Sequence, residues 1–136
     1  MEDIPITTNT ILYCKAWKKT VEFYRERLKL PVLFSTDWFV EFRLNAMARL
    51  SIADEKRSSI RGSEGQGVTI ALEVDHIEAA REYMVESGLK PTPLKKHPWG
   101  AQVFYIFDPE NHRIEIWKPV TSGTKAEETS EISKSF

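Results

Sequence analysis

The spacing of apolar residues predicts a strand and then a helix at the start of the chain. The segment 6–15 is rich in β-branched residues, which favour extended structure. Four apolar residues then recur at helical spacing, with charged residues between them: Trp17, Val21, Tyr24 and Leu28. Pro31 ends this predicted helix, because proline has no backbone N–H to donate. Three short strands are predicted to follow, over 32–35, 38–44 and 47–53.

The same order of elements is predicted a second time after a polar segment. Residues 54–67 are rich in Gly and Ser and show no periodicity, which predicts a flexible linker. A strand over 68–74 and a helix over 76–87 come next, and Asp75 with Glu78 resembles a capping box for that helix. Three further extended segments are predicted over 92–96, 101–108 and 112–118.

The two halves match when the first is shifted by 60 residues, which indicates an internal repeat. Asn9 then coincides with Thr69, and Pro31 with Pro91. In the last strand of each half, ARLSI at 48–52 matches HRIEI at 112–116, which places Ser51 on Glu115. The sequence therefore predicts an α+β fold of two βαβββ modules, at 1–53 and 68–118, joined by the linker 54–67. Residues 119–136 are rich in Thr, Ser, Glu and Lys, which predicts a disordered tail.

Composition narrows the classes of partner and the setting. The 136 residues carry 19 basic and 20 acidic side chains, so the chain has no excess positive charge that would attract nucleic acid or anionic lipid. No run approaches the roughly 20 apolar residues of a membrane span, and residues 1–10 lack the layout of a signal peptide. Cys14 is the single cysteine, so no intramolecular disulfide can form, and we expect a reducing, cytoplasmic setting. We expect Cys14 to pack beneath a helix, on the face opposite Asn9.

The order of the elements and two stretches of sequence resemble the vicinal-oxygen-chelate superfamily. The stretch PWGAQVFYIFDPENHRIEIW at 98–117 is similar to the Trp-Gly segment, alternating strand, Asp-Pro turn and glutamate-bearing strand of that group. The opening NTILY…FYRERLKLP is similar to its first strand and helix. The superfamily includes glyoxalase I, extradiol dioxygenases, fosfomycin-resistance enzymes and bleomycin-resistance proteins. The resemblance implies that the two modules curl into a partial barrel or cup, and that the protein is a homodimer.

The resemblance also implies four positions for a divalent metal, at Asn9, Ser51, Thr69 and Glu115. Only Glu115 keeps the ligand type that the family uses there. Zinc, nickel and ferrous iron prefer imidazole, thiolate and carboxylate, and neutral oxygens are poor ligands for them. We therefore expect no cofactor and no tightly bound catalytic metal, although a divalent ion such as magnesium could bind weakly.

Glu115 is the candidate catalytic or ligand-contacting carboxylate. Alternation along the strand places Arg113, Glu115 and Trp117 on one face. Glu115 is either a pocket carboxylate, acting as a general base or hydrogen-bond acceptor, or a structural group paired with Arg49 or Arg113.

A set of polar and aromatic side chains is expected on the same faces as these positions. The aromatic members either wall a groove or belong to the core, and the arginines either hold an anionic ligand group or are solvated strand ends. The expected ligand-binding residues are Asn9, Tyr13, Trp38, Phe42, Arg49, Ser51, Thr69, Glu73, Trp99, Tyr105, Arg113 and Trp117.

Three functions remain open at this level. The first is a metal-independent protein that binds a small aromatic or hydrophobic molecule, like the bleomycin-resistance group. The second is a superfamily enzyme, a lyase, isomerase or dioxygenase, with Glu115 as base or metal ligand. The third is a dimeric interaction module whose pocket has closed.

Overall fold

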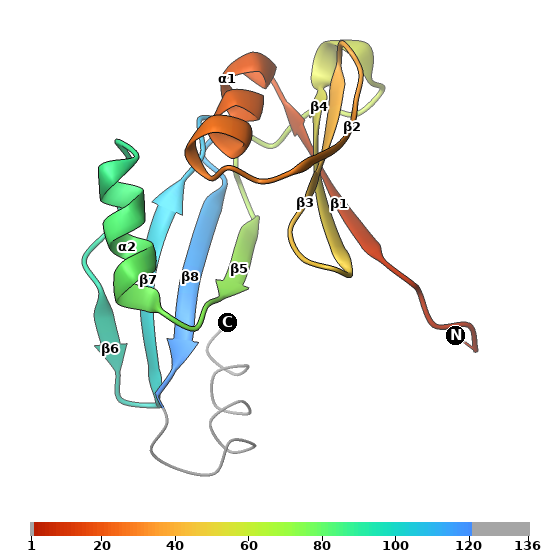
Figure 1. Ribbon diagram of the computed structural model, residues 1–136. Coiled ribbons are helices and arrows are strands. Elements are labelled where there is room, and N and C mark those ends of the chain that lie inside the picture. The colour runs from red at the N-terminus through yellow and green to blue at the C-terminus, as the bar shows by residue number, and fades with distance from the viewer. Residues whose placement is uncertain (1, 121–136) are drawn as a thin grey trace. The chain divides into compact units, whose positions relative to one another are not determined.

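The computed structural model describes residues 2–120, which divide into two compact units. The first unit contains the chain up to Gly67 together with Asp108–His112, and the second contains Val68–Phe107 together with the chain from Arg113 onward. Each unit carries one βαβββ module (Figure 1). The predicted α+β fold of two such modules is therefore confirmed. The predicted disordered tail lies outside the described residues, apart from its first two positions.

The first unit holds a four-stranded sheet in the order β1-β4-β3-β2. Its elements are β1 (Thr8–Cys14), α1 (Trp17–Glu22), β2 (Val32–Ser35), β3 (Phe39–Arg43) and β4 (Ala48–Asp54). β1 runs parallel to β4, and the other neighbours are antiparallel. The predicted helix is present, but α1 passes into a π-helical turn over Phe23–Arg27 and ends before Pro31.

The second unit repeats this order in a sheet β5-β8-β7-β6. Its elements are β5 (Thr69–Glu73), α2 (Ile77–Glu86), β6 (Lys95–His97), β7 (Ala101–Phe107) and β8 (Arg113–Pro119). β5 runs parallel to β8. β7 pairs antiparallel with β8 on one side and with β6 on the other. Neither sheet closes into a barrel. Among residues 2–120, no helix is long and apolar enough to cross a membrane.

The strand registers support the internal repeat residue by residue. Ser51 lies between Ile11 and Glu41, and Glu115 lies between Ala71 and Tyr105. Ser51 and Glu115 therefore occupy the same place in their two sheets, as the match of 48–52 with 112–116 predicted.

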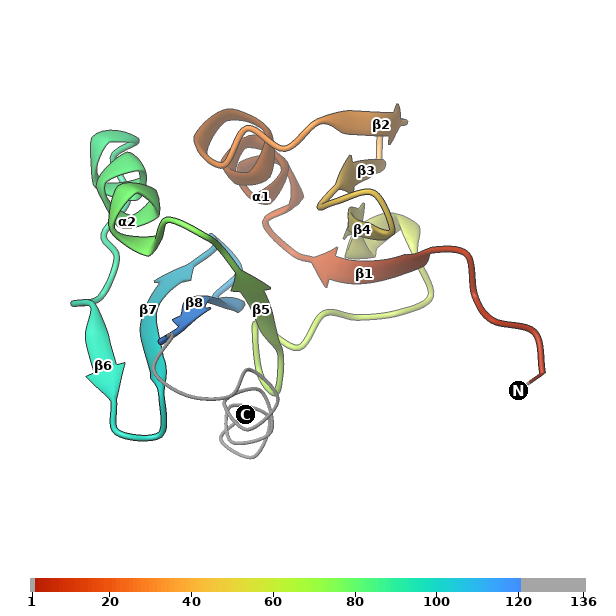
Figure 2. The same cartoon turned by 60° about the horizontal axis from the view of Figure 1, so that its bottom comes forward.

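Each helix packs on one face of its own sheet, and the apolar side of the strand alternation forms the core there. In the first unit, α1 packs across β1 and β4 (Figure 2). Cys14 is fully buried on this face, which confirms its predicted position, and burial raises the pKa of its thiol to about 12. Phe42 is also fully buried, with its ring 6.1 Å from that of Tyr24. Phe42 is thus a core residue and does not share the face of Asn9.

In the second unit, α2 packs against β8, whose Ile114 and Ile116 are buried. The predicted capping box at the start of this helix is wrong. Its N-cap is His76, and no side chain caps it. With His76 as the N-cap, Glu78 is the second helical residue, whereas a capping box needs a Glu or Gln at the third, and Asp75 precedes the N-cap.

The segment 54–67, predicted as a linker, follows a defined path within the first unit. It contains a 3-10 turn over Glu55–Arg57, and the backbone N–H of Gly62 donates to the Glu55 carboxylate over 3.1 Å. A Cβ atom on Gly62 would come within 2.0 Å of the Tyr13 carbonyl oxygen. Only glycine allows this close approach of the segment to β1.

The turn after β7 carries a buried carboxylate that joins several parts of the first unit. Asp108 is 2% exposed, and its backbone carbonyl accepts from the N–H of Asn111, which confirms the predicted turn. One carboxylate oxygen accepts from the backbone N–H groups of Glu110 and His112. The other lies 2.7 Å from the Tyr24 hydroxyl and 2.8 Å from His112 Nδ1. Both oxygens are therefore satisfied without contact with water.

We expect Asp108→Ala to lower the free energy of unfolding by about 3 kcal/mol, because it leaves buried donors without an acceptor. Urea denaturation followed by circular dichroism measures the change. Asp37→Ala is the matched control, since that side chain is 78% exposed and pairs only across 3.5 Å with Arg57. Its cost should be about 0.5 kcal/mol or less. Equal losses in the two variants would contradict the structural role of Asp108.

Candidate ligand-binding site

Glu115 lies on the face of the second sheet that points away from α2, which we call the helix-distal face. Its side chain alternates with Ile114 and Ile116, which point toward the core. Only 3% of Glu115 is exposed. Its Oε2 atom has no hydrogen-bond partner among residues 2–120. A buried carboxylate oxygen without a donor is costly, so this atom is the feature of the face that most needs an explanation.

The neighbours of Glu115 on this face form a chain of polar contacts. Tyr105 lies directly opposite Glu115 across the β7–β8 ladder. The guanidinium carbon of Arg113 lies 4.8 Å from the centre of the Tyr105 ring, a cation–π contact. Arg113 Nε also donates to Thr69 Oγ1 over 3.0 Å. Three strands therefore contribute to one surface, because β8 is paired on both sides.

Burial and the neighbouring residues shift the pKa of the Glu115 carboxyl in opposite directions. Burial raises the pKa of the Glu115 carboxyl, while a hydrogen bond with Tyr105, the Arg113 guanidinium and the nearby His97 lower it. The net direction is upward. Burial and the Glu115 charge likewise raise the pKa of the Tyr105 hydroxyl. A carboxyl in this setting can accept a proton or a hydrogen bond from a bound molecule.

Aromatic side chains border the same face. Trp99 and Trp117 are half-buried and pack, with Tyr105, against the buried Ala101 and Val103. The ring of Trp99 also stacks on His97, with centroids 4.9 Å apart. A depression of about 390 Å³ lies beside it, lined by Lys96, His97, Pro98, Gly100 and Val120. The face thus offers apolar ring surface beside a polar group.

His97 was missed by the sequence analysis. His97 pairs with Ala101 at the end of the β6–β7 hairpin, so its side chain points to the same face as that of Ala101. A sequence prediction of this hairpin register would have placed His97 on the face. The exposed Glu73 pairs with Trp117 in β8 and so shares this face, as predicted for that strand.

The corresponding face of the first sheet is different, because its polar groups satisfy one another. Asn9 Oδ1 accepts from the Ser51 hydroxyl over 2.8 Å, and Ser51 is fully buried. Arg49 lies 3.7 Å from the carboxylate of Glu41. Arg49 therefore has a partner within its own sheet, and this pairing accounts for its charge.

The remaining expected residues of the first unit lie near this face or beside it. Tyr13 is half-buried on β1, in register with Ala53. Trp38 precedes β3 and packs edge-on against Phe39, with ring centroids 5.6 Å apart. Phe42 belongs to the core, as described above.

The donors at the four family positions do not fit a catalytic transition metal. Asn9 and Ser51 are hydrogen-bonded to each other, and Thr69 accepts from Arg113. Glu115 is the single anionic donor of the set, and a guanidinium lies on the same face. In the described part of the chain, no group of three or more His, Cys, Asp or Glu side chains is arranged to hold a metal ion. Neutral oxygens beside a fixed cation are a poor environment for zinc, nickel or ferrous iron.

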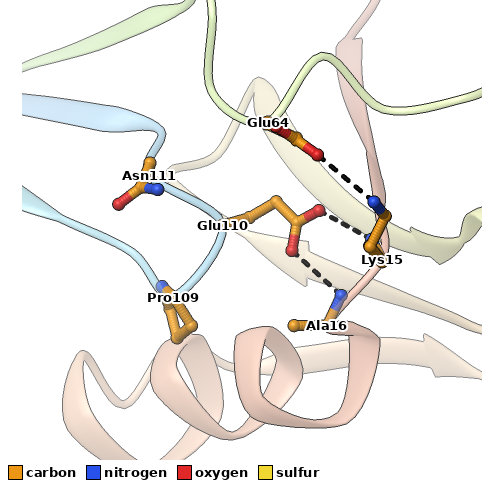
Figure 3. A pocket seen from close by; sticks show the side chains of 6 residues that line it. All are labelled: Lys15, Ala16, Glu64, Pro109, Glu110 and Asn111. Carbon is orange, nitrogen blue, oxygen red and sulfur yellow. Dashed lines mark hydrogen bonds and ion pairs between the residues drawn. The ribbon is translucent and has the colours of Figure 1, made fainter.

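A second depression, of about 240 Å³, lies in the first unit at the start of α1 (Figure 3). Glu110 points into it and accepts from the backbone N–H groups of Lys15, over 2.7 Å, and Ala16, over 2.9 Å. The Lys15 ammonium pairs with Glu64 over 3.2 Å. Glu110 and the Lys15 ammonium therefore already have partners. The contacts of Glu110 hold the 108–112 turn against the start of α1. The sequence predicted the turn but carried no signal for this contact.

Comparisons with known proteins agree with the fold. The family model for the glyoxalase-like domain matches residues 7–121. The uncharacterized protein YraH of Bacillus subtilis (strain 168) is 26% identical over 117 residues, covering 75% of this chain and 89% of that protein.

Solved structures show the same architecture at low sequence identity. A glyoxalase/bleomycin resistance protein/dioxygenase from Nocardioides has a TM-score of 0.74 at 20% identity, covering 92% of this chain and 90% of its own. TnmS3, an antibiotic binding protein from Streptomyces sp. CB03234, has a TM-score of 0.70 at 19% identity, covering 88% and 99%. Lactoylglutathione lyase from Agrobacterium tumefaciens has a TM-score of 0.68 at 17% identity, covering 87% and 94%.

The family match spans both modules, and the resemblance seen in the sequence is confirmed. The chain belongs to the glyoxalase-like domain family, within the vicinal-oxygen-chelate superfamily.

Proposed function

We propose that this protein binds a small aromatic or hydrophobic molecule on the helix-distal face of its second sheet, without a tightly bound catalytic metal. The observation that carries the proposal is the buried Oε2 atom of Glu115, which has no donor among the described residues. Leaving such a group unsatisfied costs about 1–3 kcal/mol. A bound molecule with an N–H or O–H group would recover that energy.

The aromatic border of the face supports the same proposal. Tyr105, Trp99 and Trp117 provide ring surface that can cover a flat ligand, and the carboxylate would fix its orientation. The similar fold of TnmS3, an antibiotic binding protein, supports a binding function. The poor donor set favours binding over metal-dependent catalysis, because chemistry at a metal requires ligands that this chain has not kept.

We also propose a homodimer that works in the cytoplasm. The edge strand β2 supports a partner contact, because Val32, Leu33 and Phe34 are 42%, 44% and 55% exposed. The lone buried Cys14 suits a reducing compartment.

A fragment screen tests ligand binding directly. In a thermal-shift and tryptophan-fluorescence screen of small aromatic molecules with N–H or O–H donors, we expect binders whose affinity falls at least tenfold in Glu115→Met. The methionine keeps the bulk but removes the acceptor. Glu82→Gln on the exposed side of α2 is the control and should bind like the wild type. Binders whose affinity is the same for the wild type and Glu115→Met, or a screen with no binder, would count against the proposed site.

Metal analysis tests the other half of the proposal. We expect protein purified without chelators to contain less than stoichiometric zinc, nickel, iron and manganese by mass spectrometry. Added divalent ions should shift the melting temperature by no more than about 2 °C, because weak ligands give little stabilisation by mass action. A stoichiometric metal that Glu115→Gln abolishes would overturn this half of the proposal.

The pH dependence of stability tests the state of Glu115 itself. Its pKa is raised in the folded protein, so ionisation of the carboxyl opposes folding above the unfolded value of 4.5 and has no effect well below it. Glu115→Gln should therefore raise the free energy of unfolding by about 1 kcal/mol at pH 7. The gain should vanish by about pH 4, where both states carry a protonated Glu115. Urea denaturation at several pH values measures it, and a gain that persists unchanged at low pH would contradict the assignment.

A further inference from the structure

Arg113 is a fixed positive charge on the same face as Glu115. Its Nε donates to Thr69 Oγ1, and its guanidinium lies over the Tyr105 ring. The hydrogen bond to Thr69 is the only one that the guanidinium makes with residues 2–120, so its two terminal nitrogens keep their donors. Arg113 is exposed, in contrast to Glu115. The Nε edge of the guanidinium is therefore bound to Thr69, while its two terminal nitrogens can donate to a bound molecule.

Arg113 places a positive charge beside two of the four family positions, Thr69 and Glu115. It contacts the first and acts electrostatically on the second. A metal bound to the Thr69 hydroxyl would meet the guanidinium that already uses it, and like charges repel strongly at such a distance. The Arg113 guanidinium therefore disfavours binding of a divalent ion at Thr69 and Glu115.

We propose that Arg113 and Glu115 together select the ligand, which is a planar ring molecule with an anionic oxygen for Arg113 and an O–H or N–H donor for Glu115 Oε2. This inference rests on the proposed function. A guanidinium binds carboxylates and related oxyanions through paired N–H donors. Glu115 Oε2, which finds no donor in the described part of the chain, accepts from the second group. The half-buried Trp99 and Trp117 contribute the apolar surface for the ring.

Strand geometry sets the spacing of the two ligand groups. Arg113 and Glu115 are two residues apart on β8, which separates the bases of their side chains by about 7 Å. The two groups on the ligand should accordingly stand at opposite ends of one ring. A para-substituted hydroxy acid such as 4-hydroxybenzoate has this form, whereas benzoate keeps only the anion and phenol keeps only the donor.

The experiment titrates isotope-labelled full-length protein with these three probes and follows amide resonances by NMR at pH 7. We expect 4-hydroxybenzoate to bind at least tenfold more tightly than benzoate or phenol. Arg113→Gln should remove its advantage over phenol, and Arg113→Lys should restore only part of it, because the charge returns without the paired donors. Glu115→Met should remove its advantage over benzoate. Lys90→Gln and Glu82→Gln, both exposed in the second unit, are charge-matched controls and should leave all three affinities unchanged.

Each outcome decides a different statement, and the spectra themselves report whether a variant is folded. Equal binding of 4-hydroxybenzoate by the wild type and by folded Arg113→Gln overturns the role of Arg113 but leaves binding at Glu115 in place. Failure of the wild type to bind 4-hydroxybenzoate overturns the inferred ligand class, and the wider fragment screen then decides the proposed function separately. Tighter binding of phenol than of 4-hydroxybenzoate would reverse the inferred charge preference and overturn the inference as well.

Discussion

The central constraint in each unit is the alternation of side chains along a strand that is paired on both sides. β4 and β8 each run parallel to one neighbour and antiparallel to the other, so their registers leave no freedom for a side chain to change faces. Every second residue must pack under a helix, and the residues between must face the other way. Ile114 and Ile116 stabilise the sheet for the same reason that Glu115 is presented on the helix-distal face. Packing and function are thus linked through one backbone geometry.

The two modules share this geometry but use it differently. At the repeated position the first sheet has Ser51, whose hydroxyl is satisfied by Asn9, and the second has Glu115, whose Oε2 has no donor within residues 2–120. At the next strand over, Glu41 pairs with Arg49, whereas Tyr105 lies under Arg113 and beside Glu115. The first sheet therefore closes its polar groups into internal pairs. The second sheet presents the Glu115 acceptor and the Arg113 cation on one face, which is why the proposed ligand site is placed there.

The 108–112 turn shows how a short loop can be held more firmly than its sequence suggests. Asp108 receives four donors, and Glu110 receives two backbone N–H groups at the start of α1. All these contacts lie within the first unit, although the turn joins β7 to β8. Buried carboxylates of this kind are tolerated because their hydrogen bonds replace those lost from water.

The sequence by itself determined the order of elements, the repeat and the face on which Glu115 lies, because these follow from local periodicity and from residue types such as Pro31. It also showed that Asn9, Ser51 and Thr69 are poor metal ligands, since that is a property of their chemistry. The tertiary structure decided which polar groups meet. Only strand pairing brings Arg113 to Thr69 and Tyr105, and only helix packing takes Phe42 into the core and Tyr24 to Asp108. These contacts join residues far apart in the chain, and their energy depends on burial and distance, which a one-dimensional pattern does not contain.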